Sequence, residues 1–257
     1  MCYDISYLTQ KKKKYVKRHP DKSIAALEPY FDENGEPIKT VFHVTGFEHP
    51  KIPVITNENP EEFNLFHWGL IPHWVKNKDQ AKEIHNKTIN ARGESIFEKP
   101  AFKNAALDRR CIIMVDGFFE HQHQKKQLIP HFISLKDNSP MSLAGIWEEW
   151  DNPETKEKTF TISVVTTTAN PLMTEIHNNP KLKEARMPLI LPQELENEWL
   201  MTINDNISEE QVKALIQPFD EQLMQSKTVK PIRGRTAKSQ TKDIIQPYAY
   251  GEQMGLF

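Results

Sequence analysis

Short apolar runs dominate the hydrophobic pattern of this chain. Between residues 41 and 70 these runs are rich in β-branched and aromatic residues and are broken by Pro and Asn, as in strands joined by short connections. Strands are predicted at 41–47, 52–56, 63–70, 132–135, 142–150, 159–168 and 186–191. Residues 109–120 add a buried strand, a turn and an aromatic pair that ends on a carboxylate. The pattern therefore predicts a meander-like sheet.

Helices are predicted mainly from capping residues. Asn170 followed by Pro171 matches an N-cap with proline in the first helical position, which predicts a short helix up to residue 176. Further helices are predicted after Asp21, over 193–201, and after the Ser208-x-x-Gln211 capping box. His177 falls at the end of its helix, where the dipole favours the imidazolium form; an ordinary surface histidine is the alternative.

Length and composition indicate one globular domain. The 257 residues are 38% hydrophobic and 26% charged, which excludes a disordered chain, and no repeat or Gly/Ser linker divides them. We predict a main domain over 1–225 and a basic C-terminal extension over 226–257. Because the net charge is −2, any electrostatic attraction to nucleic acid has to come from a local basic surface.

The chain has no apolar stretch of the roughly 18 residues that a membrane span needs, and no signal peptide, so a cytoplasmic, nucleoid-associated location is expected. Two cysteines are too few for a disulfide framework or a Cys-rich zinc site, and Cys111 lies in an apolar run typical of an inert core thiol. No cofactor or metal is expected, because His121, His123 and the other histidines lack HExxH spacing.

Cys2 has the most distinctive chemistry. Removal of Met1 would leave a free N-terminal cysteine, with an amine and a thiol on adjacent carbons. The amine of such a residue can condense with an aldehyde to a Schiff base, and the thiol can then close a five-membered thiazolidine. If Met1 is retained the amine is an amide, and this chemistry is lost.

Aromatic and basic residues provide candidates for DNA contact. Trp68 and Trp74 flank a Gly- and Pro-containing loop, so they are either core residues or a platform on which bases stack. Arg92 either binds DNA or pairs with Glu94. The basic run at 11–18 is either a solvated helix face or a phosphate contact.

Glu120 is the candidate proton carrier. It follows Phe118 and Phe119, and an apolar environment there would raise the pKa of its carboxyl group toward neutrality. The alternative is an exposed glutamate at the end of a strand.

Eight segments together carry a family resemblance: Cys2, 68–74 (WGLIPHW), 90–94 (NARGE), 110–120, 144–148 (AGIWE), 166–170 (TTTAN), 176–177 (IH) and 186–188 (RMP). In this order they resemble the SOS-response-associated peptidase (SRAP) family, the abasic-site processing proteins. The matching segments extend from residue 2 to about residue 191, roughly three quarters of the chain, which is far more than a single motif.

The resemblance implies a single α+β domain with a mostly antiparallel, curved β-sheet core surrounded by helices. It also implies covalent capture of abasic sites in single-stranded DNA, which shields the lesion during the DNA damage response. The catalytic residues by position would be the nucleophile Cys2, the orienting amide Asn90, the carboxylate Glu120 and the histidine His177. The residues that line the DNA would be Trp68, Trp74, Arg92, Thr166 and Arg186.

In this scheme His177 protonates the sugar oxygen as the ring opens, Glu120 moves protons to and from the amine, and Asn90 holds the N-terminus. The chain departs from the family in three places, one of which is that the family's Asn-x-Ala-Pro segment is not recognisable around residues 43–46. It begins Cys2-Tyr3-Asp4 where members commonly begin Cys-Gly-Arg, so the missing cation is expected from the basic run. Residues 178–185 form an insertion beside His177.

Two other functions use the same residues. One is a cysteine peptidase that acts at least on Met1, with Glu120 or His177 as base; the other is a non-covalent single-stranded DNA-binding module. The last residues, with Gln253, Leu256 and Phe257, resemble the peptide by which bacterial repair proteins dock on the sliding clamp, unless they pack on the protein's own core. The expected partners are abasic single-stranded DNA and this clamp, and the expected state is a monomer.

Overall fold

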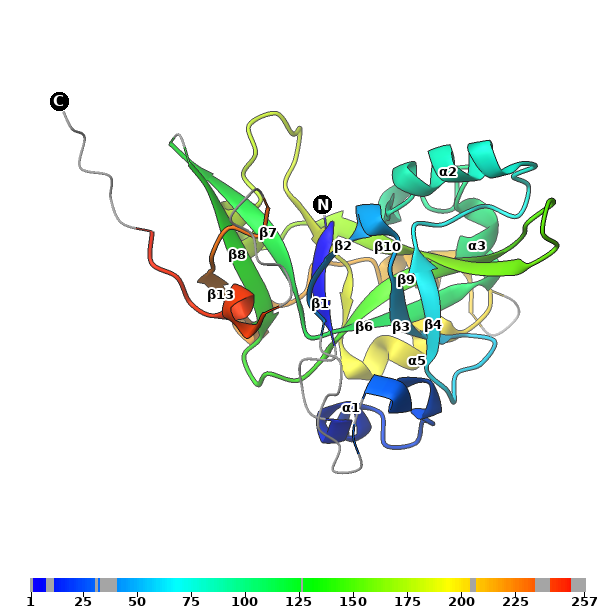
Figure 1. Ribbon diagram of the computed structural model, residues 1–257, viewed down its shortest axis with the longest axis horizontal. Coiled ribbons are helices and arrows are strands. Elements are labelled where there is room, and N and C mark those ends of the chain that lie inside the picture. Colours follow the sequence, from blue (N-terminus) through cyan, green and yellow to red (C-terminus); the bar gives the residue numbers. More distant parts are fainter. Residues whose placement is uncertain are drawn as a thin grey trace.

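Two twisted sheets occupy the centre of the molecule (Figure 1). The computed structural model describes residues 2–7, 12–30, 32, 41–125, 127–203, 207–233 and 241–250. The clamp-docking residues proposed at Gln253, Leu256 and Phe257 lie outside this part, so that interpretation stays a prediction. Within the described residues, no helix combines the length and apolar composition that crossing a lipid bilayer requires.

The first sheet carries the N-terminal strand in its interior. Its five strands are antiparallel and follow the order β13 (Met224–Thr228), β8 (Gln127–Leu135), β7 (Gly117–Gln124), β1 (Asp4–Tyr7) and β2 (Val41–Thr45). Asp4 lies opposite Phe119 in the ladder between β1 and β7. This register places Cys2 beside the part of β7 that carries Glu120. The boundary predicted between 225 and 226 falls inside β13.

The second sheet closes on itself. Its order is β11 (Arg186–Pro188), β10 (Lys158–Thr168), β4 (Asn64–Trp68), β3 (Lys51–Thr56), β6 (Arg110–Val115), β9 (Met141–Asp151) and β12 (Ile190–Leu191). β9 also pairs with β10, and the short β5 (Asn90–Arg92) adds to β10 in parallel. Most pairs are antiparallel, and among the described strands only the pairs of β10 with β4 and β5 are parallel.

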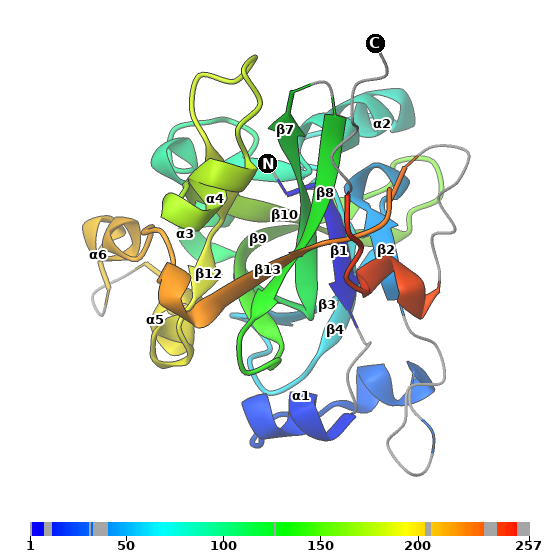
Figure 2. The ribbon, with the colours of Figure 1, turned by 90° about the vertical axis from the view of Figure 1, so that its left-hand side faces the viewer.

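Short helices surround the sheets (Figures 1 and 2). The α-helices are α1 (Lys12–Arg18), α2 (Lys78–Lys87), α3 (Lys103–Asp108), α4 (Pro171–Ile176), α5 (Glu196–Leu200) and α6 (Glu209–Ala214). The 3-10 turns are η1 (Ala25–Tyr30), η2 (Gly46–Glu48), η3 (Gly93–Ser95), η4 (Gln193–Leu195), η5 (Glu221–Leu223) and η6 (Lys242–Ile245). The expected α+β class with a mostly antiparallel, curved sheet is confirmed.

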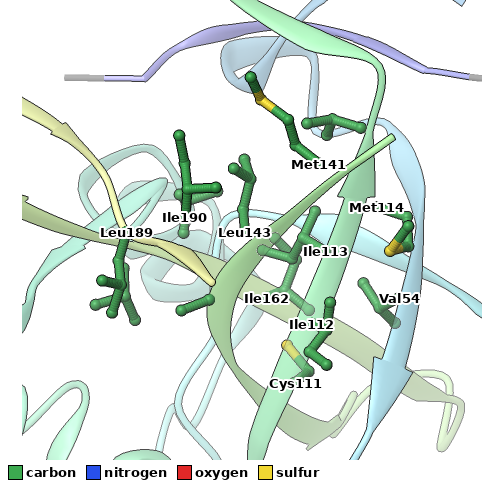
Figure 3. Close-up of a cluster of buried hydrophobic side chains, with 14 of the residues drawn as sticks. Val54, Cys111, Ile112, Ile113, Met114, Met141, Leu143, Ile162, Leu189 and Ile190 are labelled. Carbon is green, nitrogen blue, oxygen red and sulfur yellow. The ribbon is translucent and has the colours of Figure 1, made fainter. Parts of the chain in front are cut away.

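β6 runs through the hydrophobic core, and all of its residues are buried (Figure 3). Side chains of β6 such as Ile112 and Ile113 pack among residues of β3 and β9, including Val54 and Leu143. A strand that is covered on both faces has a continuous run of apolar residues in its sequence. This run explains why β6 could be predicted from the sequence. Each such buried aliphatic side chain stabilises the fold by about 1.5–3 kcal/mol.

Two predicted elements differ from the structure. The helix expected after Asp21 is the 3-10 turn η1, because Ser23 instead pairs with the segment before β4 and its backbone N–H donates to the carbonyl of Glu61 (2.6 Å). The strand expected at 186–191 is divided at Leu189, since β11 pairs with β10 and β12 pairs with β9. The helices α2 and α3 were not predicted.

Candidate active site

A small cavity of about 250 Å³ opens where the start of β1, the strand β7 and the loop after α4 meet. Its lining includes Tyr3, Glu120, His121, His177, Leu182 and Arg233. The cavity thus brings together two of the predicted catalytic residues and lies directly beside Cys2, the neighbour of Tyr3.

Asn90 holds the main chain of Cys2. Its Nδ2 donates to the Cys2 carbonyl oxygen (2.9 Å), as expected for an orienting amide. β5 is fixed by its parallel pairing with β10 and by Trp68, whose Nε1 donates to the carbonyl of Ile89 (2.9 Å). The Oδ1 atom of Asn90 is buried without a hydrogen-bond partner, so an acceptor remains available beside Cys2.

The thiol of Cys2 is almost completely buried, and its protonated form is favoured. Burial raises the pKa of the thiol well above its ordinary value, and the nearby carboxylate of Glu120 raises it further. Burial also raises the pKa of Cys111, in agreement with an inert core thiol. A raised pKa therefore does not by itself distinguish the two cysteines.

Glu120 has the environment that the sequence predicted. Its side chain is 13% exposed, and burial raises the pKa of the carboxyl group. Oε1 accepts a hydrogen bond from the backbone N–H of His121 (2.9 Å), while Oε2 lies 3.8 Å from Nε2 of His177. The raised pKa makes this carboxyl group a better candidate for exchanging protons with groups in the cavity than an ordinary exposed glutamate.

His177 is placed by α4 as predicted, but its charge state differs from the prediction. The side chain of Asn170 caps the helix by accepting from the N–H of Met173 (2.9 Å), and His177 follows the last turn as a buried residue. Burial lowers the pKa of His177 to about 4, and the charge of Arg186 adds to this effect. The expected imidazolium is wrong, because desolvation outweighs the dipole of a six-residue helix.

The hydrogen bond on the other ring nitrogen assigns the tautomer of His177. Nδ1 accepts from the backbone N–H of Arg186 (3.0 Å). A neutral imidazole that accepts through Nδ1 carries its proton on Nε2, the atom that faces Glu120. His177 is therefore a neutral hydrogen-bond donor in the cavity.

Three of the predicted DNA-lining residues are buried. Trp68 and Thr166 are 0% exposed and Arg186 is 2% exposed, so they present no surface for direct DNA contact. Trp68 supports β5, as described above. The guanidinium of Arg186 donates to Glu94 (2.7 Å), Glu184 (2.9 Å) and the carbonyl of Thr166 (2.9 Å). These residues therefore position β5, β10 and β11 around the site, which corrects the prediction.

Trp74 and Arg92 remain exposed. Trp74 is 40% exposed and lies in the loop beyond Gly69, whose φ of +112° turns the chain away from β4 in a conformation that favours glycine. The side chain of Arg92 is 55% exposed, and its Nη1 donates to Oε1 of Glu184 (2.8 Å) rather than to Glu94. The side chains of Trp74 and Arg92 are therefore accessible to a ligand such as DNA.

The insertion at 178–185 forms a wall of the cavity. Asn178 binds the backbone of His123 on β7 through both atoms of its amide, with distances of 2.7 and 3.1 Å. Leu182 lines the cavity, and Glu184 contacts the two arginines described above. In Figures 1 and 2 this yellow-green loop rises beside the tips of β7 and β8.

The cation at this site comes from an unexpected part of the chain. Both ribbon views show the basic helix α1 at the end of β1 away from the N-terminus, whereas the cavity lies at the start of β1, so α1 does not supply the missing arginine (Figures 1 and 2). Instead Arg233 donates through Nη2 to Oδ2 of the buried Asp4, whose Oδ1 contacts Nε2 of His43 (2.9 Å). The only signal for this residue in the sequence was the basic composition after residue 226.

Comparison with known proteins identifies relatives over most of the chain. The family model described as SOS response associated peptidase (SRAP) matches residues 1–233. Abasic site processing protein YoqW of Bacillus subtilis (strain 168) is 33% identical over 198 residues, which cover 77% of this chain and 82% of that protein. Abasic site processing protein YoaM of the same organism is 35% identical over 170 residues, 66% of this chain and 69% of that protein.

A solved structure has the same fold. The crystal structure of a protein from Bacteroides thetaiotaomicron superposes with a TM-score of 0.81 at 33% sequence identity, and the match covers 96% of this chain and 100% of that chain.

Proposed function

Because the chain belongs to the SOS response associated peptidase (SRAP) family, we propose that it processes abasic sites in DNA through a covalent crosslink at Cys2. The substrate is single-stranded DNA whose ring-opened abasic sugar presents an aldehyde. The crosslink shields the lesion during the DNA damage response. The single observation that carries this proposal is the meeting of Glu120 and His177 in a cavity beside Cys2, which Asn90 holds by its main chain.

The reaction requires one condensation and one addition at the same residue. After Met1 has been removed, the amine of Cys2 attacks the aldehyde carbon, and loss of one water gives a Schiff base. The thiol then adds across the C=N bond: sulfur bonds to carbon, the thiol proton is transferred by way of Glu120 to nitrogen, and a thiazolidine closes. No electrons are exchanged with an oxidant or reductant.

The electrostatics support this order of steps. Burial raises the pKa of the Cys2 thiol and so favours its less nucleophilic, protonated form, and we assign the first attack to the amine. Glu120 has a raised pKa and can accept the thiol proton and return it. His177, neutral with its proton on Nε2, donates a hydrogen bond to the sugar oxygen as the ring opens.

The size and surroundings of the cavity suit a sugar without a base. Its volume of about 250 Å³ is slightly below the roughly 300–1,000 Å³ of typical ligand pockets. Trp74 is exposed and offers a face for stacking with a neighbouring base, an interaction of about 1–3 kcal/mol in single-strand binders. Arg92 would contact the DNA backbone.

The direct test mixes processed protein with a single-stranded oligonucleotide that contains one abasic site and looks for a heat-stable, mass-shifted species. We expect one adduct per chain, with a mass equal to the sum of protein and DNA less one water. Cys2→Ser should give none, because its hydroxyl is a weak nucleophile. If wild-type protein binds the DNA but forms no adduct, the non-covalent binding function replaces this proposal.

Exposure of the amine requires removal of Met1, either by a methionine aminopeptidase or by the protein's own Cys2 and Glu120. Expression without aminopeptidase activity separates these routes. Loss of Met1 from wild-type protein but not from Cys2→Ala or Glu120→Gln would support self-cleavage, whereas retention of Met1 in all three would exclude it. We also propose a lyase activity at the same site, which would appear as strand cleavage at the abasic site.

A further inference from the structure

We propose that Arg233 is a phosphate-binding residue of the abasic-site cavity, where Asp4 holds its guanidinium beside the reacting sugar. This inference rests on the proposed function and adds a substrate-binding residue from the predicted C-terminal extension; Arg233 is the last residue that the family model matches.

The packing of the neighbouring residue fixes the position of Arg233. Ile232 is buried in a cluster with Phe119, Phe132 and other apolar residues against the five-stranded sheet. The segment that precedes it is held by the N–H of Val229, which donates to the carbonyl of Pro130 (2.9 Å). The next side chain, Arg233, therefore starts from an anchored backbone over β7 and β8.

Asp4 holds the guanidinium while leaving much of it accessible. Asp4 is 2% exposed and lies on β1, two residues from Cys2, whereas the side chain of Arg233 is 54% exposed. An arginine has five N–H donors in a planar fork, and Arg233 donates to Asp4 through Nη2. The remaining edge can donate to a second anion, and phosphate is the anion that this fork fits best.

The charges around the cavity explain why a cation is needed there. Asp4 and Glu120 contribute carboxyl groups, and burial keeps His121 and His177 neutral by lowering the pKa of each to about 4. Arg233 is the one lysine or arginine among the described residues that line the cavity. Without Arg233, the buried carboxylate of Asp4 would repel a phosphate at this cavity.

The chemistry of the substrate places an anion beside this residue. An abasic deoxyribose is esterified to phosphate on both sides, so its aldehyde carbon is a few covalent bonds from a phosphate. If the aldehyde reaches Cys2, one of these phosphates lies near the rim of the cavity, where Arg233 is exposed. The residue would therefore orient the sugar and favour an aldehyde that is part of a DNA strand over a free one.

The test compares two aldehydes in full-length, Met1-processed protein. Arg233→Gln should slow crosslinking to abasic single-stranded DNA by about tenfold, the order expected for one charged hydrogen bond. The slope of the logarithm of the rate against the logarithm of salt concentration should become shallower by about 0.7, the value for one phosphate contact. Reaction with free 2-deoxyribose, which has no phosphate, should be unchanged when followed by intact mass.

Two variants control for local charge and for geometry. Lys230→Gln removes an exposed charge three residues away that pairs with Asp243, outside the cavity, and should behave like wild type. Arg233→Lys should recover part of the DNA rate. The inference is overturned if Arg233→Gln crosslinks DNA like wild type, or if it loses the reaction with deoxyribose to the same extent, because Arg233 would then act only through Asp4.

A separate measurement distinguishes failure of this inference from failure of the proposed function. The affinity for single-stranded DNA with a tetrahydrofuran abasic analogue, which cannot form a Schiff base, is measured by fluorescence anisotropy. If wild-type protein forms no adduct with either aldehyde, the proposed function fails. A weaker, less salt-sensitive affinity of Arg233→Gln for this analogue would still support the phosphate contact, and an unchanged affinity would refute it.

Discussion

Two buried glutamate–histidine pairs in this molecule have similar geometry and different surroundings. Oε2 of Glu120 lies 3.8 Å from Nε2 of His177, and Oε2 of Glu196 lies 3.6 Å from Nδ1 of His19. In both pairs burial raises the pKa of the glutamate and lowers the pKa of the histidine to about 4. The perturbed pKa values alone would mark both pairs as candidate catalytic groups.

The neighbours of each pair separate them. Oε1 of Glu196 accepts from Ser142 (2.6 Å) and from Arg18 (2.8 Å), and His19 packs against the edge of the aromatic ring of Phe63. These contacts join α1, β9 and α5, as expected of a structural cluster. Glu120 and His177 instead line the cavity beside Cys2. The comparison shows that burial perturbs the pKa values of both pairs, whereas of the two pairs only Glu120 and His177 line the cavity for which the function is proposed.

The largest expected difference between the pairs is in the rate of crosslinking. Glu120→Gln should slow thiazolidine formation about 100- to 10,000-fold, the range for loss of a general acid–base group. Glu196→Gln should leave the rate within about twofold, because this side chain lies at a different cluster. Single-turnover gels with abasic DNA measure both rates. Equal losses in both variants would mean that the pairs are coupled.

The second difference is in stability, where substitution of Glu196 should cost more than substitution of Glu120. Glu196→Ala should lower the free energy of unfolding by about 2–3 kcal/mol, since it removes the partner of the mostly buried Arg18 and of Ser142. Glu120→Ala should change it by less than about 1 kcal/mol, because it removes a carboxyl group that burial already disfavours as an anion. Urea unfolding at pH 7 measures both values. A larger loss for Glu120→Ala would contradict this assignment.

The third expectation concerns pH, where the pairs should behave alike. His19 and His177 bind a proton near pH 4 in the folded state and near 6.5 when unfolded, so the unfolded chain binds more protons between these values. Each histidine thus makes the free energy of unfolding fall as the pH decreases from 6.5 to 4. The raised pKa values of Glu120 and Glu196 act with the opposite sign, because the folded state then retains protons above the ordinary carboxyl value.

Substitution isolates the histidine contribution. His19→Gln and His177→Gln should each reduce the slope of the unfolding free energy against pH near pH 5, by at most about 1.4 kcal/mol per pH unit. The measurement is a series of urea titrations from pH 4 to 7. Clearly unequal changes would show that the two pairs titrate differently, despite their similar geometry.

The smallest effect concerns the insertion loop beside the cavity pair. Glu184→Gln removes the carboxylate that Arg92 and Arg186 share, so it should free the exposed Arg92 for phosphate and strengthen single-stranded DNA binding about threefold. Fluorescence anisotropy at two salt concentrations measures the gain. Glu83→Gln, which removes a fully exposed carboxylate paired with Lys87 on α2, is the matched control. Weaker binding in Glu184→Gln would show that Glu184 orders the site instead.

Local sequence signals predicted the parts of this site that depend on local physics. The cap at Asn170 placed His177 at the end of α4, and the aromatic pair before Glu120 indicated an apolar environment for the carboxyl group. The strands could be predicted where their residues are β-branched or are covered on both faces of the sheet. Each of these features is determined within about ten residues of the sequence.

Contacts between distant segments could not be predicted in the same way. Arg233 and Asp4 are separated by 229 residues, and nothing in either local pattern indicates the other. Trp68 and Trp74 have the same chemistry, but one is buried and the other exposed because Gly69 turns the chain between them. The charge of His177 was predicted wrongly, because its burial depends on the insertion, β7 and β11 together.

The interior position of β1 has a consequence for the synthesis of the protein. β2 leaves the ribosome soon after β1, but Asn90 and the β7 residue Phe119, which flank the N-terminal segment in the fold, come much later. At roughly 5–20 residues per second, translation reaches Phe119 on the order of ten seconds after Asp4. During that interval the N-terminus has neither partner, and an aminopeptidase can remove Met1. The proposed nucleophile could thus be completed before the fold encloses it.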